Sequence, residues 1–338
     1  MVLLCRHDRA QEVDGVTIKP LRLSRNRLGR MTLGLARTYA SARSESASLY
    51  HLHDPELLVI APLLKRKGTV VFDAHEDLPA QILNKPWLPR LLRRPLASIA
   101  RRAIPLLLRS VDAVAAATPA IAKTVTSRPV EVVQNYPRLD SRSTGRAFAE
   151  RDRSVAYIGA MNEIRGAVQM VEALGLLPPD PPITLQFAGI FEPPHLQARL
   201  SSLSGWDRVH IAGWLSQTAV ADLLAGCRAG LVTLLPAPNF LSSQPIKLFE
   251  YMAAGLPVIA SDFPLWREIV ETNRCGVVVD PRDPRAIADA IQLVTSDDPE
   301  VEEMGRRGRD AVERIYNWGT QEPVLLDLYE GLSCASGS

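Results

Sequence analysis

Two ionisable side chains are expected on one face of a helix in the second half of the sequence. Lys247 and Glu250 stand three residues apart in the segment QPIKLFEYMAAGLPVIAS, residues 244–261. A helix is predicted to end here at Gly255, with an apolar strand after Pro257. From this face the ammonium group of Lys247 could contact a diphosphate. The simpler alternative is that both side chains lie on a solvated helix face.

A loop bounded by glycines precedes another predicted helix. The segment AYIGAMNEIRGAVQMVEAL, residues 156–174, predicts a strand, a loop from Gly159 and a helix that begins near Gly166. The free N–H groups at the start of such a helix form a ready site for anions. This segment therefore predicts a second contribution to an anion site.

Polar residues also follow an apolar strand in the first half. In the segment VVFDAHEDLP, residues 70–79, the strand ends at a loop that contains His75, Glu76 and Asp77. Because ligands bind at the carboxyl ends of strands in parallel sheets, these side chains are candidates for a binding site. The alternative is that His75 is structural and that the two carboxylates cap the loop.

A similar segment, HLHDPELL at residues 51–58, also follows a predicted strand. Asp54 is expected to cap a helix that begins at Glu56, because aspartate side chains accept hydrogen bonds from backbone N–H groups at helix starts. A part for Asp54 in ligand binding is the alternative.

Several common catalytic motifs are absent. The sequence has no GxGxxG after a strand and no GxxxxGK[ST], so a dinucleotide dehydrogenase and a P-loop nucleotidase lose their main support. It also lacks HExxH, GxSxG and an Asp-x-Asp pair, so we expect no metal and no other cofactor. The cysteines are too scattered to indicate a disulfide framework or a zinc site: Cys5, Cys227, Cys275 and Cys334.

The charge is divided unevenly along the chain. Residues 1–150 hold 24 Lys and Arg against 13 Asp and Glu, whereas residues 151–338 hold 15 against 24. The basic charge is concentrated in residues 85–109, which carry seven basic and no acidic residues among apolar ones. This pattern favours an anionic membrane surface over nucleic acid. Pro95 and Pro105 are predicted to break the segment into short helices.

The predicted elements alternate between strand and helix. This alternation, in 338 residues of ordinary globular composition, predicts two domains with parallel sheets. No apolar run is long enough to cross a bilayer and no secretory signal is evident, so a cytoplasmic protein is expected. The strands are predicted at residues 1–5, 48–51, 69–74, 113–117, 130–133, 154–158, 183–188, 209–212, 230–234, 258–261 and 276–279.

Together the motifs resemble the retaining glycosyltransferases of family 4, also called group 1, which have the GT-B fold. The resemblance runs from the first strand to the last helix. It implies an α/β protein of two Rossmann-like doubly wound domains with an interdomain cleft. It also implies that the second domain binds most of a nucleotide diphosphate sugar.

The resemblance assigns the donor contacts to particular residues. Glu250 matches a glutamate that accepts hydrogen bonds from the ribose hydroxyls, and Arg165 matches one cation of a basic pair on the diphosphate. Ala160 stands where the family has the other cation, which we expect Lys247 to replace. Ser242 stands where many members have a further glutamate. The remaining donor-side candidates are Gly159, Gly166, Gln244 and Glu268.

The resemblance also concerns the first domain. His75 matches a histidine that faces the donor sugar and helps to orient it, so it is the candidate catalytic residue. The acceptor-side candidates are Asp54, Glu76 and Asp77.

The resemblance and the polar stretch at 141–153 divide the chain into three parts. Residues 1–150 form the acceptor-side domain, residues 151–315 bind the nucleotide sugar, and residues 316–338 form a returning helix with a short tail. The first residues resemble the second strand of the family and its hairpin-like continuation, so the family's first strand and helix are expected to be lacking. The two strands beside that central strand would then have to pair with each other.

The resulting prediction is a retaining glycosyltransferase that needs no metal. It would move a sugar from a nucleotide diphosphate sugar to a glycan, a lipid-linked or a small-molecule acceptor, and contact the inner face of the membrane peripherally through residues 85–109. Two alternatives stay open. One is a noncatalytic or degenerate subunit that binds a nucleotide sugar, and the other is a nucleotide-sugar 2-epimerase on the same fold.

Overall fold

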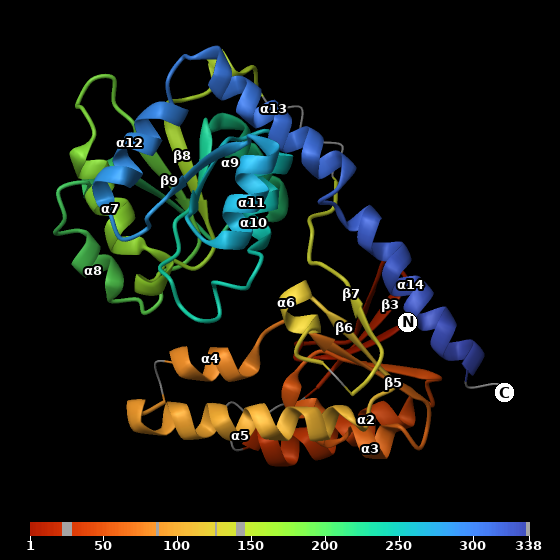
Figure 1. Ribbon diagram of the computed structural model, residues 1–338. Coiled ribbons are helices and arrows are strands. Elements are labelled where there is room, and N and C mark those ends of the chain that lie inside the picture. Colours follow the sequence, from red (N-terminus) through yellow and green to blue (C-terminus); the bar gives the residue numbers. More distant parts are fainter. Residues whose placement is uncertain (22–28, 86–87, 126, 140–145, 336–338) are drawn as a thin grey trace. The chain divides into compact units, whose positions relative to one another are not determined.

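The computed structural model describes residues 1–21, 29–85, 88–125, 127–139 and 146–335 (Figure 1). The chain forms two compact units, one of Met1–Gln134 together with Glu322–Ser338, the other of Asn135–Gln321. Each unit is built on parallel strands flanked by helices, which confirms the predicted α/β class. Every strand predicted from the sequence is present.

The second unit is a single six-stranded parallel sheet with the strand order β10-β9-β8-β11-β12-β13. This is the Rossmann order, in which the winding direction reverses between β8 and β11. The strands are β8 (Ser154–Ile158), β9 (Thr184–Ala188), β10 (Val209–Gly213), β11 (Ala229–Val232), β12 (Val258–Ser261) and β13 (Gly276–Val279). The helices are η3 (Phe148–Glu150), η4 (Glu163–Arg165), α7 (Ala167–Leu176), α8 (Leu196–Leu200), η5 (Trp206–Arg208), α9 (Gln217–Gly226), α10 (Ile246–Ala253), α11 (Pro264–Asn273), α12 (Pro284–Val294) and α13 (Pro299–Arg314).

The central strands of this sheet are buried on both faces. Their sequences are therefore continuous apolar runs and do not alternate between apolar and polar residues. Tyr157 packs into a core with α7 and α12, while its neighbour Ala156 packs into a second core with α10 and α11. Ser216 caps α9, because its side chain accepts a hydrogen bond from the N–H of Ala219.

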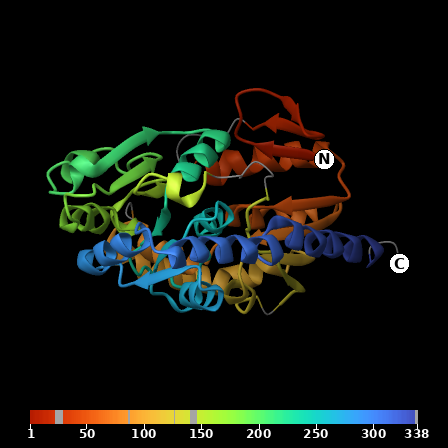
Figure 2. The ribbon, with the colours of Figure 1, turned by 90° about the horizontal axis from the view of Figure 1, so that it is seen from above.

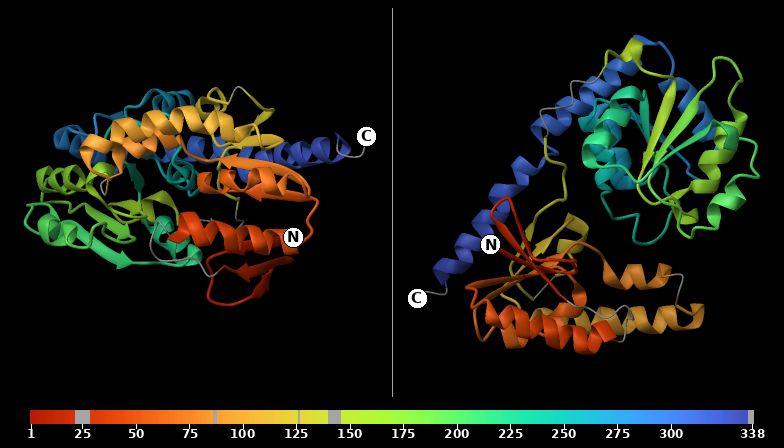
Figure 3. Two further views of the ribbon diagram at one scale, coloured as in Figure 1. Left: turned by 90° about the horizontal axis from the view of Figure 1, so that it is seen from below. Right: turned by 180° about the vertical axis from the view of Figure 1, so that it is seen from behind.

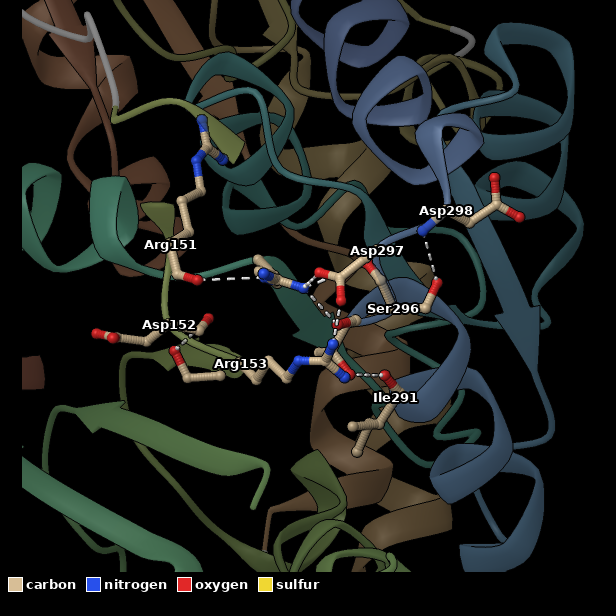
Figure 4. Close-up of polar contacts among 10 residues, drawn as sticks. Arg151, Asp152, Arg153, Ile291, Ser296, Asp297 and Asp298 are labelled. Atoms are coloured by element: carbon tan, nitrogen blue, oxygen red, sulfur yellow. Dashed lines mark hydrogen bonds and ion pairs between the residues drawn. The ribbon is translucent and has the colours of Figure 1, made fainter. Parts of the chain in front are cut away.

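A buried arginine fastens the amino ends of two strands in this unit (Figure 4). Arg228, only 4% exposed, precedes β11 and donates hydrogen bonds to the carbonyl oxygens of Thr295 and Arg151. It also pairs with the carboxylate of Asp297, which a second arginine, Arg153, contacts as well. The charge is tolerated there because its donors are satisfied.

The first unit contains two small sheets. The larger has the parallel order β4-β5-β6-β7, and the smaller has the order β1-β3-β2. The strands are β1 (Val2–Cys5), β2 (Gln11–Val13), β3 (Val16–Pro20), β4 (Leu49–Leu52), β5 (Thr69–Ala74), β6 (Ala113–Ala116) and β7 (Val130–Val132). The helices are η1 (Arg30–Gly34), α2 (Leu35–Ser44), η2 (Pro55–Val59), α3 (Ala61–Leu64), α4 (Leu78–Asn84), α5 (Arg90–Leu108), α6 (Pro119–Ala122) and, from Glu322 on, the rest of α14 (Trp318–Ala335).

The predicted pairing across the gap in the first sheet is wrong. β1 and β4 lie in separate sheets, and β1 obtains its hydrogen bonds from β3 on its other side (Figure 2). The tight turn at Asp14 and Gly15, both with positive φ, returns the chain from β2 to β3 and so supplies β1 with that partner.

The prolines of residues 85–109 do not divide the segment as predicted. Pro95 and Pro105 both lie inside one continuous helix, α5 (Figure 3). Each proline removes a backbone hydrogen bond, but the inner face of α5 packs against the core through Ile104 and Leu108. Tertiary packing of this kind outweighs the local cost. Among the described residues no helix combines the length and the apolar character that crossing a bilayer requires.

The division between the units differs from the predicted domain limits. It falls after Gln134, and the chain rejoins the first unit at Glu322. The segment before residue 150 belongs to the second unit because Tyr136 and Phe148 pack into that unit's two cores. Tyr316 likewise packs on Tyr136 there, so the return to the first unit begins later than residue 316.

Candidate functional site

Most of the donor-side candidates gather at the carboxyl ends of β8 and β11, where the strand order of the second sheet reverses. The turn after β8 depends on glycine, because Gly159 has a φ of +105°. A Cβ on Gly189, whose φ is +152°, would lie 2.0 Å from the carbonyl oxygen of Gly159. The turns after β8 and β9 therefore touch through their backbones.

Gly166 holds the other end of this loop. It adopts a left-handed conformation with a φ of +78° and precedes α7, as predicted. A Cβ at this position would lie 2.1 Å from the carbonyl oxygen of Thr233, just after β11. The Leu235 N–H also donates to the carbonyl oxygen of Ile164, at 3.0 Å. Only glycine allows the loop to approach β11 this closely.

The ammonium group of Lys247 lies buried beside this loop. Its Nζ atom is shielded from solvent, has no hydrogen-bond partner in the described part of the chain, and stands 3.9 Å from the ring centroid of Tyr157. Burial, together with the nearby charge of Arg165, lowers the pKa of Lys247 to about 7, although the charge of Glu250 opposes the shift. A buried cation whose N–H groups have no hydrogen-bond acceptor is costly and favours binding of an anion.

A second cation lies next to Lys247. The Nη1 atom of Arg165 donates to the carbonyl oxygen of Ala160 at 3.1 Å. A Cβ on Gly159 would stand 3.8 Å from both Arg165 Nη1 and Lys247 Nζ, so the two cations flank the same glycine. The hydroxyl of Thr233, at the end of β11, is also buried without a partner among the described residues. This arrangement can hold an anion such as a diphosphate.

The remaining donor-side candidates differ in their surroundings. Glu250 lies one helical turn from Lys247 on α10, and burial raises its pKa while Lys247 opposes the shift. The side chain of Gln244 forms a hydrogen bond with Tyr136. Glu268 is exposed on α11, and no hydrogen bond or ion pair within the described ranges joins it to the other candidates. The structure thus groups Glu250, but not Glu268, with the two cations.

The first unit contains a polar cluster around His75, where β4 and β5 end. The Nδ1 atom of His53 lies 2.9 Å from the Asp73 carboxylate, and Nδ1 of His75 lies 3.8 Å from the same oxygen. The ring of His51 stacks on the ring of His53. The Nδ1 atom of His51 lies 2.6 Å from the hydroxyl of Tyr329 on α14. Asp73 therefore links the candidate catalytic histidine to a second histidine.

The environment sets the charge of this cluster. Burial and, less strongly, the neighbouring His53 lower the pKa of His51 to about 4, although the charge of Asp73 opposes the shift. The hydrogen bond with Asp73 raises the pKa of His53. Ligand atoms of His51, His53 and Asp73 lie within 4.8 Å of one another, a spacing that a metal ion could bridge. The expected absence of a metal therefore stays a prediction.

The acceptor-side carboxylates have mostly local contacts. Asp77 caps α4 by accepting a hydrogen bond from the Ala80 N–H, as the alternative interpretation proposed. Glu76 accepts one from the side chain of Gln81. The predicted cap at Asp54 is wrong, because its side chain makes no capping bond. The backbone carbonyl oxygen of Asp54 closes the turn of η2 instead, because it accepts a hydrogen bond from the N–H of Leu57.

Sequence reasoning missed several residues of these sites. His53 and Asp73 face each other because β4 and β5 pair in parallel with His51 opposite Val71, a register that the sequence does not display. The H-x-H spacing before Asp54 was the available signal, since alternate residues of a strand share a face. No local pattern indicated that Tyr157 would lie against the ammonium group of Lys247.

Comparison with known proteins finds a matching family and several named relatives. The family model described as glycosyl transferases group 1 matches residues 140–311. A phosphatidyl-myo-inositol mannosyltransferase of Mycobacterium leprae is 26% identical over 300 residues, which cover 85% of this chain and 74% of the relative. A D-inositol 3-phosphate glycosyltransferase of Corynebacterium urealyticum is 26% identical over 53% of this chain, which spans 43% of that relative's length.

Solved structures share the fold. Sucrose-phosphate synthase from Thermosynechococcus elongatus has a TM-score of 0.77 and 18% identity, over 99% of this chain and 89% of that chain. Anabaena HepE in complex with UDP-glucose has a TM-score of 0.71 and 16% identity, over 94% of this chain and 86% of that chain. These likenesses confirm the GT-B fold. Because the family model matches half of the chain, this protein belongs to the group 1 glycosyl transferases and is a glycosyltransferase.

Proposed function

We propose that this glycosyltransferase moves a sugar from a nucleotide diphosphate sugar to an acceptor hydroxyl with retention of configuration and without a metal. The observation that carries the proposal is the convergence of Lys247 and Arg165 on Gly159, with Glu250 one turn away on α10. In this assignment the two cations bind the diphosphate, and the Glu250 carboxylate accepts hydrogen bonds from the ribose hydroxyls.

The same cations would favour the reaction. As the bond between the anomeric carbon and the diphosphate oxygen breaks, negative charge grows on the leaving group. Lys247 and Arg165 are already in place beside it, so they stabilise that charge without reorganisation. The acceptor oxygen forms its bond on the face that the diphosphate leaves, and its proton departs with the leaving group. The fixed cations can thus take the part that a metal ion plays elsewhere.

The donor site is tested by thermal shift with UDP, GDP, ADP and dTDP sugars. We expect one nucleotide to raise the melting temperature selectively, and Glu250→Ala to remove this shift, because the ribose loses a charged acceptor worth about 1.5–3 kcal/mol. The matched control is Glu271→Ala, an exposed glutamate of α11 that pairs with Arg267. It should keep the full shift.

Other outcomes would identify the rivals. Stabilisation by none of the four nucleotides would contradict the donor site. Stabilisation without transfer to any acceptor would favour the noncatalytic subunit. Conversion of the donor sugar to its 2-epimer without an acceptor would favour the epimerase.

We also propose that α5 places the enzyme on an anionic membrane that carries the acceptor. Exposed apolar side chains recur along one side of the helix at Leu92, Leu96, Ile99 and Leu106. The helix contains no acidic residue, and Arg94 and Arg102 are exposed on it. A helix of this composition lies in a bilayer interface, its apolar stripe inserted and its arginines near anionic headgroups.

Neutralising the exposed arginines tests this orientation. Arg94→Gln combined with Arg102→Gln should lower binding to phosphatidylglycerol vesicles about tenfold or more, since each cation contributes ~1 kcal/mol near such a surface. Co-sedimentation measures the effect. The control combines Arg282→Gln with Arg285→Gln in the acidic second unit and should bind normally. Equal binding of both double variants and the unsubstituted protein would defeat the proposal.

A further inference from the structure

The first unit contains a partly open, mainly apolar cavity that none of the proposed contacts uses. Its volume is about 310 Å³, and it lies between α4, α5, α6 and the end of β5. Much of its lining is apolar and includes the buried side chains of Leu58, Phe72, Leu108 and Ile121. A cavity of ~150 Å³ with such a lining stays dry and binds benzene, and ligand sites begin at roughly 300 Å³. This cavity therefore suits an apolar ligand larger than a single ring.

The polar residues of the lining come from the loop that carries the candidate catalytic histidine. Glu76 and Asp77 line the cavity and directly follow His75 in the chain. Arg101 of α5 lines it too, and makes no ion pair within the described ranges. A molecule with an apolar part inside the cavity would hold its polar end at these groups, next to His75.

The helix that lines the cavity also carries the proposed membrane surface. Ile104 and Leu108 of α5 face the cavity, whereas Leu96 and Ile99 of the same helix are exposed. One helix thus has an inner apolar face on the cavity and an outer apolar stripe without a partner among the described residues. An amphiphile with an alkyl chain could leave a bilayer beside α5 and remain in apolar surroundings.

We propose that this cavity binds one alkyl chain of a lipid-type acceptor, either acyl or isoprenoid, and holds the acceptor's hydroxyl-bearing headgroup at the His75 loop. The role of this ligand as an acceptor rests on the proposed glycosyl transfer. Binding of an alkyl chain in the cavity does not depend on that function. Apolar chains gain free energy with each methylene that leaves water, so affinity should rise with chain length until the cavity is full.

Binding of cis-parinaric acid, whose fluorescence rises in apolar surroundings, tests the cavity. We expect saturable binding at one site, and Leu78→Trp and Ile104→Trp should each weaken it at least tenfold by filling the space from α4 and from α5. The control is Leu63→Trp on α3, which adds the same bulk outside the cavity lining and should bind normally. Two cavity-filling variants are used so that the test still stands if one of them fails to fold. Thermal melts show which variants remain folded.

Competition by alkyl β-glucosides of six to fourteen carbons, each below its micelle concentration, supplies the second measurement. Each added methylene should strengthen competition about threefold to fourfold until a plateau is reached. Binding that does not saturate, that has no plateau, or that the filling variants leave unchanged would overturn the proposal. Saturable binding of the probe by a chain that transfers no sugar would uphold the cavity and contradict the proposed function. Donor binding, which belongs to the second unit, should be normal in both filling variants.

Discussion

Lys247→Met is expected to weaken binding of the nucleotide diphosphate sugar by about 10- to 100-fold. The variant keeps most of the side chain's volume beside Tyr157 but removes the ammonium group. Among the described residues this group has no hydrogen-bond partner, so it is free to bind the diphosphate. A hydrogen bond to a charged group contributes about 1.5–3 kcal/mol, which sets this range. Isothermal titration calorimetry with the nucleotide sugar that stabilises the protein measures the loss.

The pH dependence of the same binding identifies Lys247 more specifically. Its pKa is lowered to about 7, first by burial and then by Arg165, so the free protein loses this charge as the pH rises through 7. Because the diphosphate favours the charged form, donor affinity should fall by up to tenfold per pH unit from pH 7 to 9. A nucleotide sugar has no phosphate group that titrates in this range. The Lys247→Met variant should bind weakly at every pH.

Arg165→Ala is the matched comparison. It should also weaken binding, but it removes a like charge, so the pKa of Lys247 should rise and the decline in affinity should begin at a higher pH. An unsubstituted protein whose donor affinity is constant from pH 6 to 9 would show that Lys247 does not hold the diphosphate.

His75→Ala is expected to lower the rate of transfer by about 10²- to 10³-fold and to leave donor affinity unchanged. His75 belongs to the first unit, whereas the proposed diphosphate contacts belong to the second, so the substitution should separate catalysis from donor binding. Loss of a positioned catalytic side chain produces effects of this size. Single-turnover transfer and calorimetry on the same preparation measure the two quantities.

The control for this variant is His210→Ala, an exposed histidine of β10 in the second unit. It should transfer at the normal rate. Full activity of His75→Ala would remove His75 from the reaction, and loss of donor binding in that variant would show that its effect is not confined to catalysis.

Most of the local structure was predictable, because it depends on neighbouring residues. Gly166 precedes α7 where the sequence indicated, since a left-handed turn before a helix is decided within a few residues. The strands were predictable for a similar reason, because short apolar runs between turns have few other ways to bury themselves.

The failures have a different origin. Pro95 and Pro105 should break a helix, yet α5 continues because its inner face packs on the core, and packing is not visible in local sequence. The pairing of β1 with β3 instead of β4 depends on which strand edges meet in space. The cap predicted at Asp54 failed because the backbone carbonyl accepts the first hydrogen bond of the turn and the side chain makes no capping bond.

The sequence by itself determined the family and the order in which the strands follow one another along the chain. It also determined the residue types at the carboxyl ends of β5, β8 and β11. It also predicted that Lys247 and Glu250 lie on one face of a helix, because residues three apart in a helix are neighbours on its surface. The resemblance predicted that Lys247 and Arg165 would act as a pair, but only the tertiary structure decided that the ammonium group of Lys247 would lie buried against the ring of Tyr157. Burial in that shared environment is what moves the pKa of Lys247 toward 7, and burial depends on residues far apart in the chain.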